Sequence, residues 1–93
     1  MKLGFIGGGV MAEAIISGVR RANLDADITV GEPVAERRAT LESAYGVVGV
    51  AENSAAIDGA DLIVLAVKPQ QLEGVASQIV DTLSSEQTVL SIL

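Results

Sequence analysis

Apolar runs alternate with segments of helical periodicity along the whole chain. The run "KLGFI" at residues 2–6 predicts a strand, and three glycines separate it from a stretch with an apolar helical face. That face consists of Ala12, Ile15, Ile16 and Val19. Polar residues, Glu13, Ser17, Arg20 and Arg21, take the opposite face. We therefore expect a strand that leads directly into an amphipathic helix.

The same alternation is repeated in the next segment. "DITV" at residues 27–30 predicts a second strand, and Pro33 suits the first position of a helix over residues 34–45. Val34, Leu41 and Tyr45 lie on one face of that helix, and Gly46 is a typical stop.

The middle of the chain predicts two further strands. "GVVGV" at residues 46–50 is a short β-rich run, after which Asn53 or Ser54 is expected to cap a brief helix that ends near Gly59. "DLIVLAV" at residues 61–67 is the most continuously apolar stretch of the sequence. It predicts a central strand that is buried on both faces.

The last segment predicts a fourth helix and a fifth strand. Pro69 can open the helix, whose apolar positions follow helical spacing at Leu72, Val75, Ala76, Ile79 and Leu83. "TVLSIL" at residues 88–93 then predicts a strand. Strands that alternate with amphipathic helices indicate βαβ units. The expected fold is a Rossmann-type, doubly wound parallel sheet in three α/β/α layers.

Composition limits the possible functions. The chain has 93 residues, 49% hydrophobic, with a net charge of −6 and neither cysteine nor histidine. The acidic balance argues against nucleic acid as a partner, and a disulfide, a catalytic thiol and a zinc site are not expected. The sequence has no apolar run long enough to predict a membrane segment, so we expect a cytoplasmic location.

The glycines form a recognisable motif. Gly7 to Ala12 reads G-x-G-x-x-A, directly after a predicted strand and at the start of a predicted helix. In this pattern Gly7 permits a tight turn, Gly9 lets the backbone approach a pyrophosphate, and the small Ala12 lets the helix pack close to the sheet. The N–H groups and the dipole of the helix supply the anion site. A glycine-rich turn without a ligand is the alternative.

Signals for the cofactor conflict. Glu32 ends the second predicted strand, where an acidic residue can accept hydrogen bonds from the adenosine ribose, and this favours NAD. Arg37 and Arg38 follow in the next helix, and an arginine there can pair with the 2′-phosphate of NADP. A capping glutamate and a solvated basic face are the alternatives. NAD and NADP therefore both stay open.

A second candidate segment follows the apolar fourth strand. "LAVKPQ" turns from that strand into a helix through Lys68 and Pro69, and ligands of such sheets lie outside the carboxyl ends of the strands. We expect Lys68 near the nicotinamide half of a cofactor, with a solvent-exposed loop lysine as the alternative. Asn53 reaches the same edge, as a ligand or as a plain cap. Met11 and Tyr45 are expected to be packing residues.

Three stretches together resemble pyrroline-5-carboxylate reductase: "GFIGGGVMAEAIISG", "AERRATLESAYGV" and "ADLIVLAVKPQ". The resemblance covers essentially the whole chain. It implies reduction of a cyclic imine acid to L-proline with NAD(P)H, without a catalytic residue from this segment, and it favours NADP because these enzymes often accept it. The implied cofactor contacts are Ile6, Gly7, Gly8, Gly9, Val10, Met11, Glu32, Asn53, Ala66, Val67, Lys68 and Pro69.

The resemblance also sets expectations for the rest of the protein. The chain stops inside a predicted strand, where only Ser91, Ile92 and Leu93 represent the family's next turn. We therefore expect residues 1–93 to be the NAD(P)-binding part of a longer homo-oligomeric enzyme, without its helical dimerisation and substrate domain. Glu32 departs from the serine, asparagine or arginine more common in the family. A β-hydroxyacid dehydrogenase, or a non-catalytic NAD(H)-sensing module, is the alternative.

Overall fold

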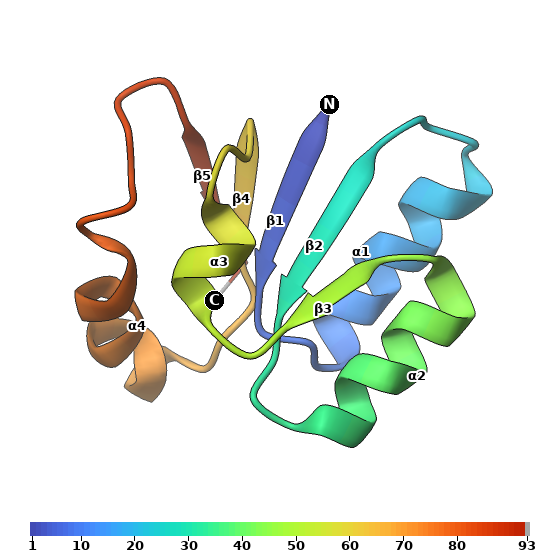
Figure 1. Ribbon diagram of the computed structural model, residues 1–93, viewed down its shortest axis with the longest axis horizontal. Helices are drawn as coiled ribbons and strands as arrows, with labels where there is room; N and C mark the ends of the chain where they lie inside the picture. Colours follow the sequence, from blue (N-terminus) through green and yellow to red (C-terminus); the bar gives the residue numbers. More distant parts are fainter. Residues whose placement is uncertain (93) are drawn as a thin grey trace.

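A computed structural model describes residues 1–92, in which strands and helices alternate (Figure 1). The strands are β1 (Lys2–Ile6), β2 (Asp27–Gly31), β3 (Val48–Val50), β4 (Leu62–Leu65) and β5 (Thr88–Ser91). The helices are α1 (Val10–Arg21), α2 (Ala35–Tyr45), α3 (Asn53–Ile57), the short 3₁₀ turn η1 (Pro69–Gln71) and α4 (Leu72–Ile79). Each predicted strand and helix is thus present in the described part of the chain, and Leu93, the last residue of the last predicted strand, lies outside it.

The strands form one parallel sheet in the order β3-β2-β1-β4-β5. From β1 the chain first builds outward through β2 and β3, and it then returns to the other side of β1 to add β4 and β5. This reversal is the switch point of a doubly wound sheet, where a crevice opens at the carboxyl ends of the strands. The predicted fold class is confirmed.

Helices cover both faces of the sheet. α1 and α2 pack on one face, in a first core that includes Ile16 and Leu41, and α3 and α4 pack on the other, in a second core that includes Ile57 and Val75. In Figure 1, α2 lies to the right of the strands and α4 to their left. Neighbouring residues of a strand point to opposite faces, so Phe5 belongs to the first core and Ile6 to the second. On β4, Val64 likewise faces one core while Ile63 and Leu65 face the other. This confirms that β4 is a central strand buried on both faces.

Several expected helix ends were wrong. Pro33 does not open a helix, because Val34 is extended at the N-cap and α2 begins at Ala35. Glu52, in place of Asn53 or Ser54, holds the N-cap position of α3. The C-cap of α4 is Val80, and Leu83 therefore lies outside the helix.

Of the two expected packing residues, Tyr45 packs against the first core, as predicted, and Met11 does not. Met11 is 59% exposed, so it is not a packing residue. The hydroxyl of Tyr45 makes a hydrogen bond to Glu13, in addition to packing against the first core. Within residues 1–92, no helix combines the length and apolar character that crossing a bilayer would demand.

Candidate functional site

A cleft of about 560 Å³ opens at the carboxyl ends of the strands. This volume lies in the range of small-molecule sites. One wall comes from the glycine loop and the end of β2, and the other from the β4 turn, α3 and α4. The lining residues are Ile6, Gly7, Gly8, Gly9, Gly31, Glu32, Pro33, Asn53, Ala66, Val67, Lys68, Gln71, Gly74, Val75 and Gln78.

Gly7 makes the tight turn that leads from β1 into the glycine loop. Its φ of +97° lies in the region that favours glycine, and a Cβ atom there would lie 2.6 Å from the carbonyl oxygen of Ala66. The Gly7 N–H donates to the carbonyl of Gly31 at 2.9 Å. The loop is therefore held between the ends of β2 and β4. A side chain at Gly7 would not fit there.

Gly9 is the N-cap of α1 and lines the cleft. A Cβ atom at Gly9 would have no neighbour within 4 Å, so space is open beside its backbone. The first N–H groups of a helix have no partner within the helix, and they carry the positive end of its dipole. Ala12 is completely buried against the sheet, as the motif requires for close packing. This arrangement is the geometry that the motif predicts for binding an anion without a basic side chain.

Glu32 joins the end of β2 to the glycine loop. Its Oε1 accepts a hydrogen bond from the N–H of Gly8 at 3.1 Å, and its Oε2 accepts one from the N–H of Val34 at 2.9 Å. The side chain also lines the cleft. Glu32 is thus both a support of the loop and a carboxylate beside the open space.

Arg37 contacts the other side of the glycine loop. Its Nε donates to the carbonyl of Gly8, and its Nη2 donates to the carbonyl of Gly9 at 3.3 Å and to Oε1 of Glu13 at 2.6 Å. Tyr45 donates its hydroxyl to Oε2 of the same glutamate at 2.6 Å. We refer to Arg37, Glu13 and Tyr45 as the brace. It connects α1, α2 and the loop.

The brace shifts the pKa values of its own members. The hydrogen bond from Tyr45, and next that from Arg37, lower the pKa of the Glu13 carboxyl. The same hydrogen bond to Glu13, with desolvation second, raises the pKa of the Tyr45 hydroxyl. Near neutral pH the pair therefore exists as a carboxylate that accepts from a neutral phenol.

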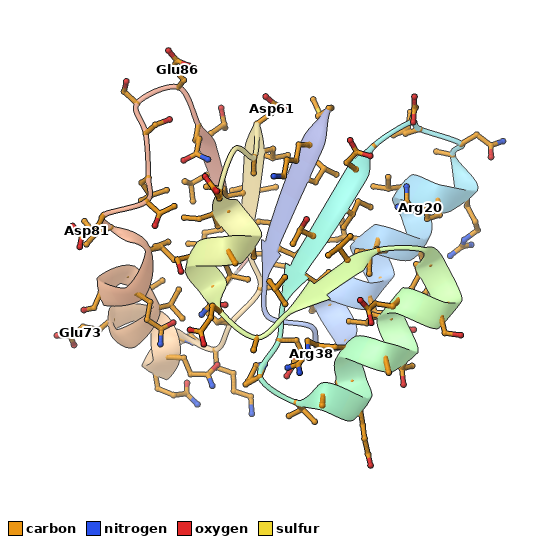
Figure 2. The ribbon with its side chains drawn as sticks, viewed as in Figure 1. Arg20, Arg38, Asp61, Glu73, Asp81 and Glu86 are labelled. Atoms are coloured by element: carbon orange, nitrogen blue, oxygen red, sulfur yellow. The ribbon has the colours of Figure 1, made fainter. Side chains whose placement is uncertain are left out.

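Arg38 is engaged separately, at the turn before α2. Its Nη1 donates to the carbonyls of Glu32 at 2.7 Å and of Pro33 at 3.1 Å. Figure 2 shows Arg38 near the end of the strands where α2 begins, whereas Asp61 lies at the opposite end of the strands. Neither Arg37 nor Arg38 lines the cleft. Both arginines bind backbone carbonyls, unlike the solvated basic face that was the alternative.

The opposite wall of the cleft carries amides and one cation. Asn53 donates from Nδ2 to Oε1 of Gln78 at 2.6 Å, and this bond links α3 to α4. The N–H of Lys68 donates to Oε1 of Gln71 at 3.2 Å, which fixes the turn after β4. Lys68 is exposed and is the one basic side chain among the lining residues.

The structure brings most of the expected site residues to this one cleft. Those that line it are Ile6, Gly7, Gly8, Gly9, Glu32, Asn53, Ala66, Val67 and Lys68. Val10, Met11 and Pro69 lie beside the cleft in the chain but do not line it. Gly31, Pro33, Gln71, Gly74, Val75 and Gln78 line it and were not expected. Positions 71, 74, 75 and 78 repeat at helical spacing, and that spacing could have identified them as one face of α4 together with its N-cap, Gln71.

The chain is similar over its whole length to a known family. The family described as "NADP oxidoreductase coenzyme F420-dependent" matches residues 2–93. The pyrroline-5-carboxylate reductase of Pseudomonas aeruginosa is 36% identical over 92 residues, covering 98% of this chain and 34% of the relative. Pyrroline-5-carboxylate reductase 1 of Bacillus subtilis is 38% identical over 95 residues, covering 99% of this chain and 32% of the relative.

Solved structures agree with these relatives. The pyrroline-5-carboxylate reductase of Coxiella burnetii superposes with a TM-score of 0.89 at 33% identity, covering 97% of this chain and 34% of that one. The Plasmodium falciparum enzyme, solved with NADP bound, has a TM-score of 0.79 at 27% identity, covering 99% of this chain and 33% of that one. The chain spans about a third of the length of the curated relatives that it matches.

Proposed function

We propose a function that proceeds from family membership, because the chain belongs to the family described as NADP oxidoreductase, coenzyme F420-dependent. Within that family it is an NAD(P)-binding domain of the pyrroline-5-carboxylate reductase type. The proposed activity of the whole enzyme is the reduction of 1-pyrroline-5-carboxylate to L-proline with NADH or NADPH, the last step of proline synthesis. The cleft that unites the glycine loop with the Lys68 turn carries this proposal.

The proposed role of each wall follows from its chemistry. The N–H groups at the start of α1 bind the diphosphate of the cofactor, because they combine free donors with the helix dipole. Glu32 accepts hydrogen bonds from the ribose hydroxyls on the adenosine side. The Lys68 turn, which lines the far wall, is proposed to hold the nicotinamide half.

The inventory of side chains suits an imine reduction. When bound, the nicotinamide supplies the hydride. A ring imine that is already protonated accepts it without a general base, so the absence of histidine from the chain is compatible with this reaction. This chain positions the cofactor and contributes no catalytic residue. For the whole enzyme we further propose a group that binds the carboxylate of the substrate. We also propose a homo-oligomer and a cytoplasmic location.

A chimera tests the proposal. Residues 1–93 would replace the matching segment of the Pseudomonas aeruginosa reductase, and nicotinamide absorbance would be followed after addition of 1-pyrroline-5-carboxylate. We expect turnover with NADH, NADPH or both. The 93 residues alone should bind cofactor without turnover, since the substrate pocket is largely missing.

The matched control is the same chimera with Gly9→Val, which should fold and lose activity. A folded chimera that consumes neither cofactor would reject the reductase assignment. Turnover by the isolated 93 residues would instead show that the substrate pocket lies within this chain.

A further inference from the structure

We propose that Glu13 and Tyr45 set the ratio of NADPH to NADH affinity, by holding Arg37 against the glycine loop. The inference rests on the proposed function, because it concerns the nucleotide that we propose for the cleft beside this loop. Glu13 and Tyr45 are positioning residues here, since they act through Arg37. Glu13 and the 2′-phosphate of NADPH compete for the same guanidinium.

Arg37 is the arginine whose position depends on a charged partner. It forms the ion pair with Glu13, in which the Nη2 to Oε1 distance is 2.6 Å and the side chains are 28% and 34% exposed. Arg38 instead donates to two neutral backbone carbonyls, and its stem lies against Gly49, where a Cβ atom would be 2.9 Å from the Cβ of Arg38. A change at Glu13 therefore frees a donor on Nη2 of Arg37, whose bonds to the carbonyls of Gly8 and Gly9 remain, and it leaves Arg38 in place.

The location of Arg37 suits a role beside the adenosine ribose. It bonds to the carbonyl of Gly8, while Glu32 accepts from the N–H of the same residue. Arg37 and Glu32 thus bind the carbonyl and the N–H of the same glycine, Gly8. A 2′-phosphate on a ribose held by Glu32 would lie in the neighbourhood of this guanidinium, and phosphate is a strong acceptor for arginine.

Tyr45 controls which way the Glu13 carboxylate points. Its hydroxyl binds Oε2, and this leaves Oε1 for Arg37. Arg37 and Tyr45 stand eight residues apart, about two turns along one face of α2. Both reach Glu13 on α1, so the brace spans the interface between these two helices. Loss of the hydroxyl should weaken the hold on Arg37 less than loss of the carboxylate charge.

Titration calorimetry with NADH and NADPH on the full chain tests the proposal. For Glu13→Gln we expect NADPH affinity to rise about tenfold relative to NADH, because the phosphate no longer competes with a carboxylate. Tyr45→Phe should shift the ratio in the same direction by about threefold. The control Glu36→Gln removes one negative charge from an exposed position on α2, the helix that carries Arg37 and Tyr45. It should leave the ratio of NADPH to NADH affinity within about twofold of that of the unmodified chain.

The double variant Glu13→Gln/Arg37→Gln separates positioning from general stabilisation. If Arg37 is the phosphate ligand, its removal abolishes the gain in NADPH affinity that Glu13→Gln produces. Equal losses for both nucleotides in Glu13→Gln, or an undiminished gain without Arg37, would overturn the proposal. Circular dichroism confirms folding, and Tyr45→Phe alone supplies the test should Glu13→Gln unfold.

The outcomes also separate this inference from the proposed function. An unmodified, folded chain that binds neither nucleotide would overturn both. Binding by the unmodified chain together with an unchanged ratio in all variants would overturn only the role of the brace.

Discussion

The two walls of the cleft are built in different ways. On the loop wall, charged side chains hold backbone groups: Glu32 and Arg37 bond to the two polar groups of Gly8, and Glu13 and Tyr45 hold Arg37 in turn. On the far wall, uncharged amides bond to one another or to the backbone, as in the Asn53 to Gln78 contact. The loop wall is thus fixed by charge-assisted bonds, whereas the far wall is held by weaker neutral ones.

The outermost strand on the far-wall side is less buried than the strand that leads into the glycine loop. β1, which leads into the glycine loop, lies between two strands, and Phe5 and Ile6 are completely buried. β5 is an edge strand whose residues are all exposed, with Val89 and Leu90 about half exposed. The charge-assisted bonds of the loop wall predict a more rigid wall than the neutral bonds of the far wall. We expect the walls to respond differently to matched substitutions.

The largest effect should come from Gly7→Val on the loop wall. A side chain there is strained by the positive φ and collides with the carbonyl of Ala66, so we expect unfolding to become easier by about 3 kcal/mol or more. The matched change on the far wall is Gly74→Ala in α4, where a Cβ atom meets nothing within 4 Å. It should raise stability by about 0.5–1 kcal/mol. Urea unfolding measures both, and equal responses would contradict the comparison.

A smaller effect is expected from Glu32→Ser, which removes the carboxylate from the loop wall. Gly8 and Val34 lose the acceptor for their N–H groups, so stability should fall by about 1–2 kcal/mol. If the carboxylate also faces the ribose, NADH binding weakens more than NADPH binding. Glu32→Gln, which keeps an acceptor, is the control. Dissociation constants for both nucleotides measure the outcome, and an unchanged ratio would remove Glu32 from the site.

The smallest effect that we expect is a loss of the stability contributed by Glu13 at acid pH. The pKa of Glu13 is lowered from its usual 4.5, chiefly by the hydrogen bond from Tyr45 and then by that from Arg37. Its contribution to stability is therefore present above about pH 4.5, and it is lost as pH falls through the lowered pKa. The difference in unfolding free energy between the unmodified chain and Glu13→Gln should shrink over that range. A difference that is constant with pH would show that the carboxylate charge does not hold the brace.

The fold and the loop wall were largely predictable from local sequence. Apolar periodicity located every strand, and the glycine spacing located the turn, because both signals act over a few neighbouring residues. The role of Gly7 followed from its place directly after a strand, and the structure adds the contact with Ala66 that makes it specific to glycine.

The brace and the far wall were less predictable. Glu13 lies 24 residues from Arg37 and 32 from Tyr45, so their contact depends on how α1 packs beside α2. Neighbour spacing carries no information on such a packing. Asn53 looked like a cap for the same reason, since its partner Gln78 lies 25 residues further along the chain. The start of α2 was misplaced although the contact that fixes it is local: Glu32 accepts from the N–H of Val34, two residues further on, and Val34 is extended.

Titration of the folded chain with NADH and NADPH, in parallel with Gly9→Val, tests most directly whether the glycine loop is a nucleotide site. Gly9 has open space beside it and extended backbone angles, so the substitution should leave the unfolding midpoint nearly unchanged. We expect the unmodified chain to bind at least one nucleotide, and Gly9→Val to bind it more weakly by roughly 30-fold, about 2 kcal/mol. Equal affinity in the two proteins, or no binding by the unmodified chain, would contradict the assignment.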